Sequence, residues 1–562
     1  MRLRNILAIA IALGIPGALS AQSPAVGAAG WRADLKYLVG TIKAVHPRPF
    51  HRVTESSFDS AAQSLDARLT RLTDQQAALG LMRLVSLVHD GHTVLDPAGP
   101  VFTRRTWYPV RIDRLADGFF VVATSPAHRE LLGARVTALG GRPIEKVWDS
   151  VLVLAPGDNI FSRMTRVPYW MMMPEMLSAL GLSTPERLAL DVEIDGARRS
   201  QTVDAVTGDF SIWMVFRDRV AGDSTVTLPA RDDADLPFRR RDQFYWFTVT
   251  SGLLYAQVND VSDADGAVTL DRDTARVTLR EFGSRVLARI DSGDVDVVVL
   301  DLRNNPGGNN GLIQAFVHGL ESRAKINSRG HLFVITGRRT YSAAMNFTSL
   351  LEERTAAIFV GEPPGGSPSH YGDATSFTLP NSKLSFNVST LHWDLGVAPT
   401  DVREVHEPGL LAPPAMEAIR AGRDPALEMI RAWKSGGLLR ERLLERYRNG
   451  GVDSALALAR AEATGPGLWP SRVQEMVAFG YSLYGVKAPG ADMRRVFEAI
   501  TEIYPESHYA WFQLGRLHQF SGRPGDAAAA FARARRLRPS NDLIRRFSEA
   551  ATRQAAQPPK NN

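Results

Sequence analysis

Between residues 279 and 360 the chain alternates continuous apolar runs with segments of helical periodicity. The apolar runs span residues 297–300, 331–336 and 357–360, and the helical patterns cover 279–290, 312–320 and about 343–353. Continuous apolar runs are typical of parallel strands that are buried on both faces, and their alternation with helices indicates an α/β architecture. We therefore predict an α/β core with a mostly parallel sheet over residues 236–415.

The remainder of the 562 residues is too long for one further core, so we predict a multi-domain chain. Apolar residues at helical spacing predict an N-terminal helical region, and short strands between turns predict a β-rich region. The hairpin pattern of residues 133–144 resembles that of PDZ domains. The predicted boundaries are 22–104 for the helical region and 105–235 for the PDZ-like region.

The C-terminal part, residues 437–552, is predicted to be all-α. Its last segment matches the spacing of tetratricopeptide repeats at Trp511, Leu514, Gly515, His518, Ala527, Phe531, Ala534 and Pro539. One period earlier, Phe497 and Pro505 match the same pattern. Because two repeats bury little surface, we expect a third helical pair from about 440 to 465 or packing on the body. We expect residues 553–562 to form a disordered tail.

The N-terminus has the layout of a secretory signal peptide over residues 1–21. Arg2 and Arg4 precede an apolar run that is too short to span a bilayer, and small residues follow it. We expect a mature chain that begins near Gln22, has no membrane span and is periplasmic or secreted. The chain has no cysteine, which excludes cysteine nucleophiles and cysteine metal sites. The net charge of +6 is weak for this length and predicts no nucleic-acid partner.

Two strand ends in the predicted core carry residues suited to chemistry. The first is followed by Gly307 and Gly308, which let backbone N–H groups approach a ligand closely and suit an oxyanion hole. The second leads to Ser342 at a strand-to-helix turn, where the N–H of Ala343 is a further candidate oxyanion donor. From spacing alone, Ser342 is equally well interpreted as a helix N-cap, and the glycines as a simple turn.

Together, residues 301–308, 340–344 and 360–366 resemble the motifs of the carboxyl-terminal processing, or tail-specific, protease family. The resemblance covers residues 30 to 410 and includes residues 396–401. It implies that Ser342 is the nucleophile of a serine-type peptidase, with oxyanion donors from Gly307 or Gly308 and from Ala343. The bacterial members use a Lys about 25 residues after this Ser, but Ser367 stands there. Lys383 is a remote substitute for that Lys.

The tricorn-like branch of this family uses a His from the upstream helical region, and His92 lies at the matching place. A His is a suitable general base near neutral pH, and a carboxylate usually orients it. By resemblance that carboxylate is Asp394, with Asp401 as the alternative. His370 is the alternative base, and His92 by itself also fits a structural role at a helix end.

These features predict an exported peptidase that acts on a peptide or protein substrate, with a protein partner docking on the C-terminal repeats. His89 and His92 have the spacing of a metal pair, but the sequence nearby offers no third ligand cluster, so we expect no metal and no cofactor. The alternatives are a catalytically weak binding protein on the same fold, with a peptide or apolar ligand, and a scaffold built on the repeats.

Overall fold

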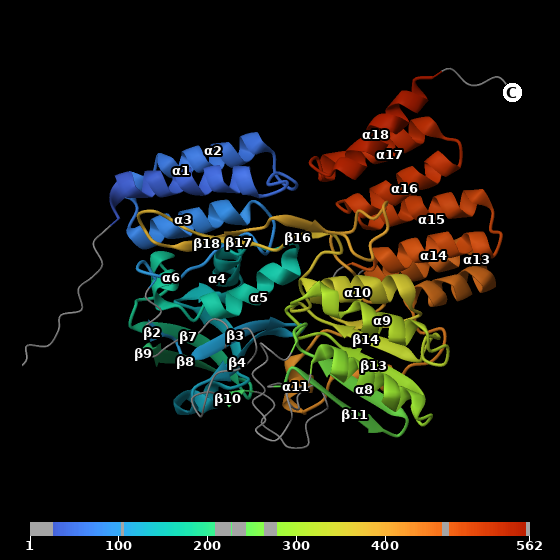
Figure 1. The fold of residues 1–562 in the computed structure, drawn as a ribbon, viewed down its shortest axis with the longest axis horizontal. Helices are drawn as coiled ribbons and strands as arrows, with labels where there is room; N and C mark the ends of the chain where they lie inside the picture. Colours follow the sequence, from blue (N-terminus) through green and yellow to red (C-terminus); the bar gives the residue numbers. More distant parts are fainter. Residues whose placement is uncertain are drawn as a thin grey trace, which may run out of the picture.

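The computed structural model describes residues 26–102, 106–207, 226–227, 243–263, 278–463 and 471–557. The predicted signal peptide lies outside these ranges. Figure 1 shows four bodies along the chain: N-terminal helices, a β-rich region beneath them, an α/β core, and C-terminal helices stacked above that core. The mixed α/β, multi-domain architecture that the sequence predicts is confirmed at this level.

The core sheet has six strands in the order β11-β12-β13-β14-β15-β20. The strands are β11 (Tyr245–Thr250), β12 (Leu253–Val258), β13 (Val297–Asp301), β14 (Leu332–Thr336), β15 (Ile358–Gly361) and β20 (Leu410–Leu411). The first pair is antiparallel and every later pair is parallel. The three apolar runs of the sequence are therefore neighbouring parallel strands, as predicted.

Helices cover both faces of this sheet, which explains the continuous apolar runs. Val298 and Leu300 pack with α8 (Leu279–Asp291), α9 (Gln314–Glu321) and α10 (Ala343–Arg354) on one face. Val299, one residue out of phase, packs with α12 (Pro425–Arg431) on the other face. Since neither face meets water, the strands carry apolar side chains at successive positions.

The β-rich region is built on an antiparallel sheet with the path β10-β4-β5-β7-β8 and side pairings of β3 and β6. The strands are β3 (Val110–Leu115), β4 (Gly118–Thr124), β5 (Arg135–Leu139), β6 (Arg142–Pro143), β7 (Arg187–Ile194), β8 (Ala197–Asp204) and β10 (Val226–Thr227). The predicted hairpin over 133–144 is present as β5 and β6, but Ile144 already begins α4 (Ile144–Leu152). Helix α5 (Ile160–Trp170) and α6 (Pro174–Ala179) follow.

The N-terminal helices α1 (Gly27–Val45), α2 (Glu55–Asp66) and α3 (Asp74–Ser86) share one hydrophobic core with the β-rich region. After α3, the chain runs into β1 (Val94–Leu95), which pairs with β18 (Ser385–Val388) in a sheet with β17 (Thr375–Thr378). The buried Asp34 carboxylate on α1 accepts N–H bonds from Asn381 and Ser382 in the loop between those strands. The helices and the β17–β18 hairpin together hold residues 89–93 in place.

The C-terminal body contains α13 (Leu439–Ala463), α14 (Val473–Gly485), α15 (Gly490–Ile503), α16 (His508–Phe520), α17 (Pro524–Leu537) and α18 (Asp542–Ala555). Helix α13 breaks at Gly451, so it supplies two helical segments. Successive helices pack closely through small residues: a Cβ on Gly480 would lie 2.7 Å from the Phe497 ring, and one on Gly515 would lie 2.7 Å from the Phe531 ring.

This body contacts the N-terminal region through polar side chains. The Ser540 hydroxyl donates to the His51 carbonyl (2.6 Å), and Arg48 pairs with Asp542 (2.9 Å). Helix α18 continues to Ala555, so it includes the first three residues of the predicted tail. Within the described ranges, the structure contains no helix that is both long and apolar enough to cross a membrane.

Candidate active site

The Gly-rich turn after β13 is held by one buried amide side chain. Asn305 donates from Nδ2 to the Val258 carbonyl (3.0 Å) and accepts the Gly307 N–H at Oδ1 (2.9 Å). Its own carbonyl accepts the N–H of Tyr341 (3.1 Å), which ties this turn to the turn after β14. Asn305 therefore fixes the glycines beside the segment that carries the serine.

Ser342 lies between β14 and α10 in a strained backbone conformation. Its φ is 53° and its ψ is −125°, a region that residues other than glycine rarely adopt. The side chain makes no capping bond to α10, so the N-cap interpretation of this serine is not met. In the same turn, the Thr340 hydroxyl donates to the Leu302 carbonyl (2.8 Å), which ties the turn to the end of β13.

His92 meets this hydroxyl although 250 positions separate the two residues in the chain. Its Nε2 lies 3.0 Å from Ser342 Oγ, which is hydrogen-bond distance. The loop after α3 that carries His92 is fixed by Asp90, whose carboxylate accepts the N–H groups of His92 (2.9 Å) and Thr93 (3.1 Å). Burial lowers the pKa of His92 below 6.5, against the opposing effect of the Asp90 and Asp158 charges.

The other ring nitrogen of His92 contacts a tyrosine, where the sequence predicts a carboxylate. Tyr341 Oη lies 3.0 Å from His92 Nδ1, and the same hydroxyl donates to Asp158 Oδ1 at 3.2 Å. Asp158 is 4% exposed and also accepts the Gly91 N–H at 2.8 Å. Burial and the nearby Asp90 charge raise the pKa of Asp158 to about 6.

Sequence reasoning missed both Tyr341 and Asp158. Asp158 precedes the Asn159 that caps α5, so its sequence context is typical of a helix start. Tyr341 directly precedes Ser342, and its sequence context is typical of an ordinary turn residue. No local signal marks either residue, because their partners lie roughly 70 to 250 positions away in the chain.

The carboxylates that the sequence predicts for this role lie elsewhere. Asp394 is exposed and lies near His392. Its charge raises the pKa of His392, but burial lowers that pKa by more. Asp401 pairs with Arg403 at 2.7 Å. Neither contacts His92. The resemblance is loose in register at Asp394.

The alternative bases are also displaced from the serine. The His370 ring stacks on His92 with centroids 6.2 Å apart, and its Nδ1 bonds the Ser367 carbonyl at 3.0 Å. Burial lowers the pKa of His370 to about 4. Lys383 turns outward and donates to the Pro380 carbonyl (2.7 Å). The structure thus brings His92, and neither of these residues, into hydrogen-bond contact with Ser342.

The backbone donors differ in their availability. Gly307 N–H is already bonded to Asn305, so the expectation that it serves as an oxyanion donor is not met. In the described part of the chain, the N–H groups of Gly308 and Ala343 have no protein acceptor. The lack of a side chain at Gly307 instead lets the two turns approach each other, because a Cβ there would lie 2.8 Å from Ala343 N. Gly308 and Ala343 remain the candidate donors.

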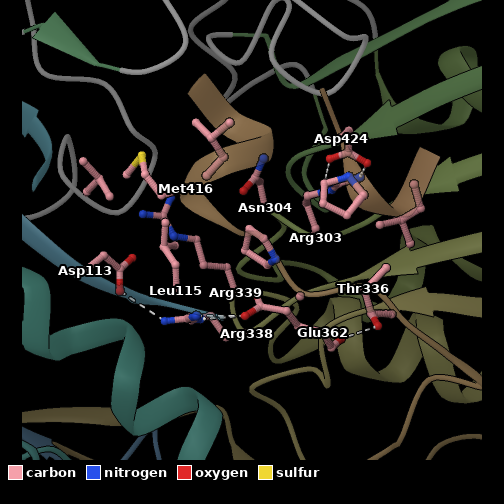
Figure 2. A pocket seen from close by; sticks show the side chains of 18 of the residues that line it. Asp113, Leu115, Arg303, Asn304, Thr336, Arg338, Arg339, Glu362, Met416 and Asp424 are labelled. Atoms are coloured by element: carbon pink, nitrogen blue, oxygen red, sulfur yellow. Dashed lines mark hydrogen bonds and ion pairs between the residues drawn. The ribbon is translucent and has the colours of Figure 1, made fainter. Parts of the chain in front are cut away.

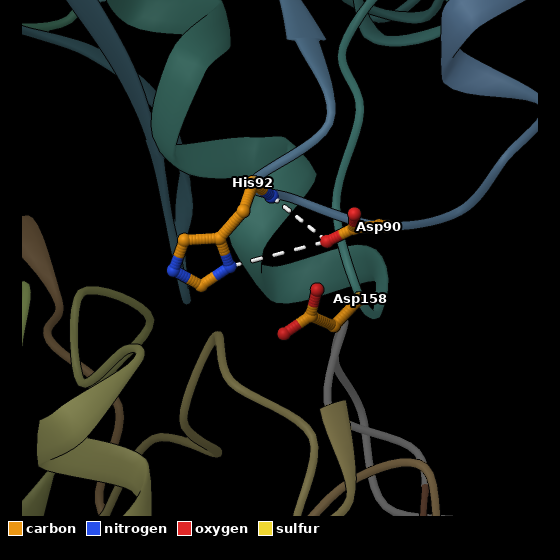
Figure 3. A group of neighbouring side chains, drawn as sticks. All are labelled: Asp90, His92 and Asp158. Atoms are coloured by element: carbon orange, nitrogen blue, oxygen red, sulfur yellow. Dashed lines mark hydrogen bonds and ion pairs between the residues drawn. The ribbon is translucent and has the colours of Figure 1, made fainter. Parts of the chain in front are cut away.

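Three ligand-type side chains cluster behind the serine. Asp90, His92 and Asp158 offer ligand atoms within 4.8 Å of one another, and Figure 3 shows them converging from two loops. His89 is not part of this group. The atoms are already used: Asp90 accepts two N–H bonds and contacts His46 (3.3 Å), and His92 Nδ1 meets Tyr341. The cluster is therefore a hydrogen-bonded support for the His92 ring.

A pocket of about 180 Å³ opens between the β-rich region and the carboxyl ends of the core strands. Figure 2 shows two ion-pair groups in its lining: Arg338 bridging Asp113 and Glu362, and Arg303 paired with Asp424. A smaller cavity of about 60 Å³ shares Asn304, Arg338 and Arg339 with this pocket and reaches Tyr341. The smaller cavity therefore lies beside the candidate site, and the larger pocket lies next to it at the domain junction.

Comparison with known proteins gives the fold class. No family model matches the chain, and no curated protein matches it. Among solved structures, mature CPAF complexed with lactacystin has a TM-score of 0.51 at 14% identity, covering 72% of this chain and 97% of CPAF. A second structure of mature CPAF has a TM-score of 0.50 at 14% identity, covering 75% and 98%.

The photosystem II D1 C-terminal processing protease is more distant, with a TM-score of 0.32 at 13% identity, covering 69% of this chain and 94% of its own. The likeness to mature CPAF, at 14% identity, shows a shared fold. The chain therefore has the overall fold of CPAF over about three quarters of its length.

Proposed function

We propose that the protein is an exported serine-type peptidase, of the tail-specific, tricorn-like kind, with Ser342 as nucleophile and His92 as general base. The observation that carries this proposal is the 3.0 Å contact between His92 Nε2 and Ser342 Oγ, at a serine that is strained and makes no cap. A nucleophile and a base within hydrogen-bond reach define the usual serine hydrolase geometry. The fold shared with CPAF and the motif resemblance support the same class.

In the proposed reaction, His92 Nε2 takes the hydroxyl proton while Ser342 Oγ attacks the substrate carbonyl. The Gly308 and Ala343 N–H groups stabilise the oxyanion that forms, and each such donor is worth about 3 kcal/mol in known enzymes. His92 then gives its proton to the leaving amine, and the acyl-serine remains. Water, deprotonated by His92, attacks this ester and releases the acid with Ser342 restored.

A lowered pKa suits His92 to this role. The base must be neutral to accept a proton, and burial keeps the neutral form dominant to a lower pH than for a free imidazole. The rate is therefore expected to fall only on the acid side of the usual histidine range. Peptide substrates are supported by the pocket at the carboxyl ends of the core strands and by the neighbouring smaller cavity, which Tyr341 lines.

The test is Ser342→Ala with a fluorophosphonate probe and a casein substrate. The wild type is expected to label and hydrolyse, and the variant to do neither. Ser284→Ala is the matched control, because Ser284 is exposed on α8 and bonds only its own helix. Labelling that persists in Ser342→Ala would place the reactive serine elsewhere.

Export and partner docking are part of the proposal. The N-terminal layout supports cleavage near Gln22, which mass spectrometry of the secreted chain tests. The glycine–aromatic packing in α14–α17 supports tetratricopeptide-like repeats as a docking surface. The rival is a binding protein on the same fold, and a chain that never labels but co-purifies with a peptide or apolar ligand would favour it.

A further inference from the structure

Tyr341 stands between the ring of His92 and a buried carboxylate, so one phenolic hydroxyl joins two residues that do not touch each other. The distances are 3.0 Å from Oη to His92 Nδ1 and 3.2 Å from Oη to Asp158 Oδ1. The tyrosine ring also stacks on the imidazole, with centroids 4.7 Å apart and planes 25° from parallel. Tyr341 therefore contacts the imidazole in two ways, with its ring on the imidazole face and with its hydroxyl at Nδ1.

The hydrogen bonds around Tyr341 determine which ring nitrogen of neutral His92 carries the proton. A tyrosine hydroxyl carries one proton, and in this arrangement it is donated to Asp158. The contact between Oη and His92 Nδ1 then needs its proton from the imidazole, so Nδ1 is protonated. A neutral imidazole has one N–H, which leaves Nε2 as the acceptor that faces Ser342.

The reverse order requires a different charge state. If Tyr341 donated to Nδ1, its oxygen would face Asp158 Oδ1 without a proton between them, unless Asp158 itself were protonated. Asp158 Oδ1 already accepts the Gly91 N–H, as expected of a carboxylate. The other nearby carboxylate does not replace it, because Asp90 Oδ1 is 3.9 Å from Nδ1 and is bonded to the His92 backbone.

We propose, on the basis of the proposed function, that Tyr341 is a positioning residue which, backed by Asp158, holds the Nδ1–H tautomer of His92 and so keeps Nε2 free for Ser342. The tyrosine hydroxyl takes the place that a carboxylate holds in Ser-His-Asp triads. When His92 gains the serine proton, both ring nitrogens carry hydrogen, and the Oη contact remains satisfied. No bond to Tyr341 is made or broken.

Gly91 provides the space that this contact needs. A Cβ on Gly91 would lie 2.1 Å from Tyr341 Oη and 2.9 Å from its Cζ, and these are closer than side chains tolerate. The Gly91 backbone is not in the positive-φ region, and the remaining close contact of a Cβ would be with Gly157 Cα at 3.3 Å, so the tyrosine hydroxyl is the main obstacle to alanine. Gly91→Ala is therefore a second, independent way to displace the hydroxyl.

The first test compares probe-labelling rates in Tyr341→Phe and wild type. Removing the residues that orient a histidine ligand in metal sites costs about 10–100-fold in activity, and a loss of that size is expected here. Tyr37→Phe, at an exposed tyrosine on α1 (42% exposed), is expected to leave the rate unchanged. Equal rates in Tyr341→Phe and wild type would overturn the proposal.

The pH profile separates positioning from loose packing. Without Oη, the imidazolium loses the acceptor of its Nδ1–H, so the acid limb of the labelling rate is expected to move to lower pH. The other charged or titratable groups facing the ring are Asp90, Asp158, Arg166 and His370. Tyr341→Phe replaces none of them, and among them only Asp158 loses a hydrogen bond, the one from Oη. A uniform loss of rate with an unmoved acid limb would contradict the proposal.

Gly91→Ala is expected to reduce labelling as Tyr341→Phe does, and the double variant is expected to lose less than the sum of the two. Gly40→Ala is the control, since a Cβ there meets nothing within 4 Å. Fully additive losses would show that the two changes act separately, against the proposal.

A readout that needs no activity comes from ¹⁵N-histidine NMR, with the His92 signals assigned through His92→Gln. The expected neutral-pH spectrum has Nδ1 protonated and Nε2 unprotonated in wild type, and a tautomer mixture in Tyr341→Phe. A wild type with its proton on Nε2 would overturn the inference. Failure of the proposed function, in contrast, appears as absent wild-type labelling whatever the tautomer.

Discussion

Gly307 lies directly against Ser342: a Cβ built on the glycine would stand 2.6 Å from the serine Cβ. This contact brings the turn after β13 to the turn after β14 and requires the absence of a side chain. Gly307→Ala is expected to displace the serine and to lower probe labelling by at least about 100-fold, since small misplacements cost that much. Labelling kinetics measure it.

Backbone strain is a separate effect of that substitution, because Gly307 has a φ of 108°. Gly293→Ala supplies the control: its φ is 96°, and a Cβ there meets nothing within 4 Å. We expect Gly293→Ala to lose about 1 kcal/mol of stability with full labelling. Equal labelling in the two variants would show that the Gly307–Ser342 contact is unimportant.

The two candidate bases are distinguished by the same substitution at each. His92→Gln removes the group 3.0 Å from Ser342 Oγ, and general-base loss costs about 10²–10⁴-fold. His370→Gln changes a ring that only stacks on His92, so a loss below about 10-fold is expected. Steady-state hydrolysis of a peptide substrate measures both, and a larger loss at His370 would reverse the assignment.

Asp158 makes stability depend on pH in a defined direction. Its pKa is raised to about 6 by burial and the Asp90 charge, whereas an unfolded aspartate titrates near 3.9. Between these values the native state binds a proton that the unfolded chain has lost. The contribution of this group to the free energy of unfolding therefore falls as pH rises from about 4 to about 6, and stays low above that.

Asp158→Asn removes this titration. The free energy of unfolding of the variant, relative to wild type, is expected to be more favourable at about pH 7.5 than at about pH 4. Urea denaturation at the two pH values measures the difference. A difference that is constant with pH would mean that the native pKa of Asp158 is not raised.

Arg338 joins the β-rich region to the core by pairing with Asp113 at 3.1 Å and with Glu362 at 2.8 Å (Figure 2). Arg338→Ala leaves these mostly buried carboxylates without their cation, which costs about 3–5 kcal/mol. The exposed pair of Arg285 and Glu281 is the control, and Arg285→Ala is expected to cost at most about 1 kcal/mol. Chemical denaturation compares the two; equal costs would contradict the prediction.

The core elements were predictable because their signals are local. The strand β13 and the helix α8 each appear as one periodic pattern, and burial on both faces explains the apolar run at 297–300. The placement of Ser342 at a strand-to-helix turn follows from the same patterns. The motif resemblance favours a nucleophile over a helix N-cap at Ser342, and the strained backbone and missing cap bond agree with that interpretation.

The residues that orient His92 and the oxyanion donors could not be predicted from local patterns. The sequence favours Asp394 and offers Gly307 or Gly308 as a donor, yet Asp394 lies exposed beside His392 and the Gly307 N–H bonds Asn305. Both expectations depend on a one- or two-residue register that a motif match does not settle. A hydrogen bond depends on a few tenths of an ångström and on which edge of a side chain faces its partner.

The sequence by itself determined the alternating core, the turn that exposes Ser342 and the presence of His92 in an upstream loop. Only the tertiary structure decided that Tyr341 and Asp158 stand behind the His92 ring, at 3.0 Å and 3.2 Å along one hydroxyl. Secondary structure arises from contacts between residues a few positions apart, so its pattern is written locally. The hydrogen bonds that orient His92 join three separate loops, and their partners are set by how the domains pack.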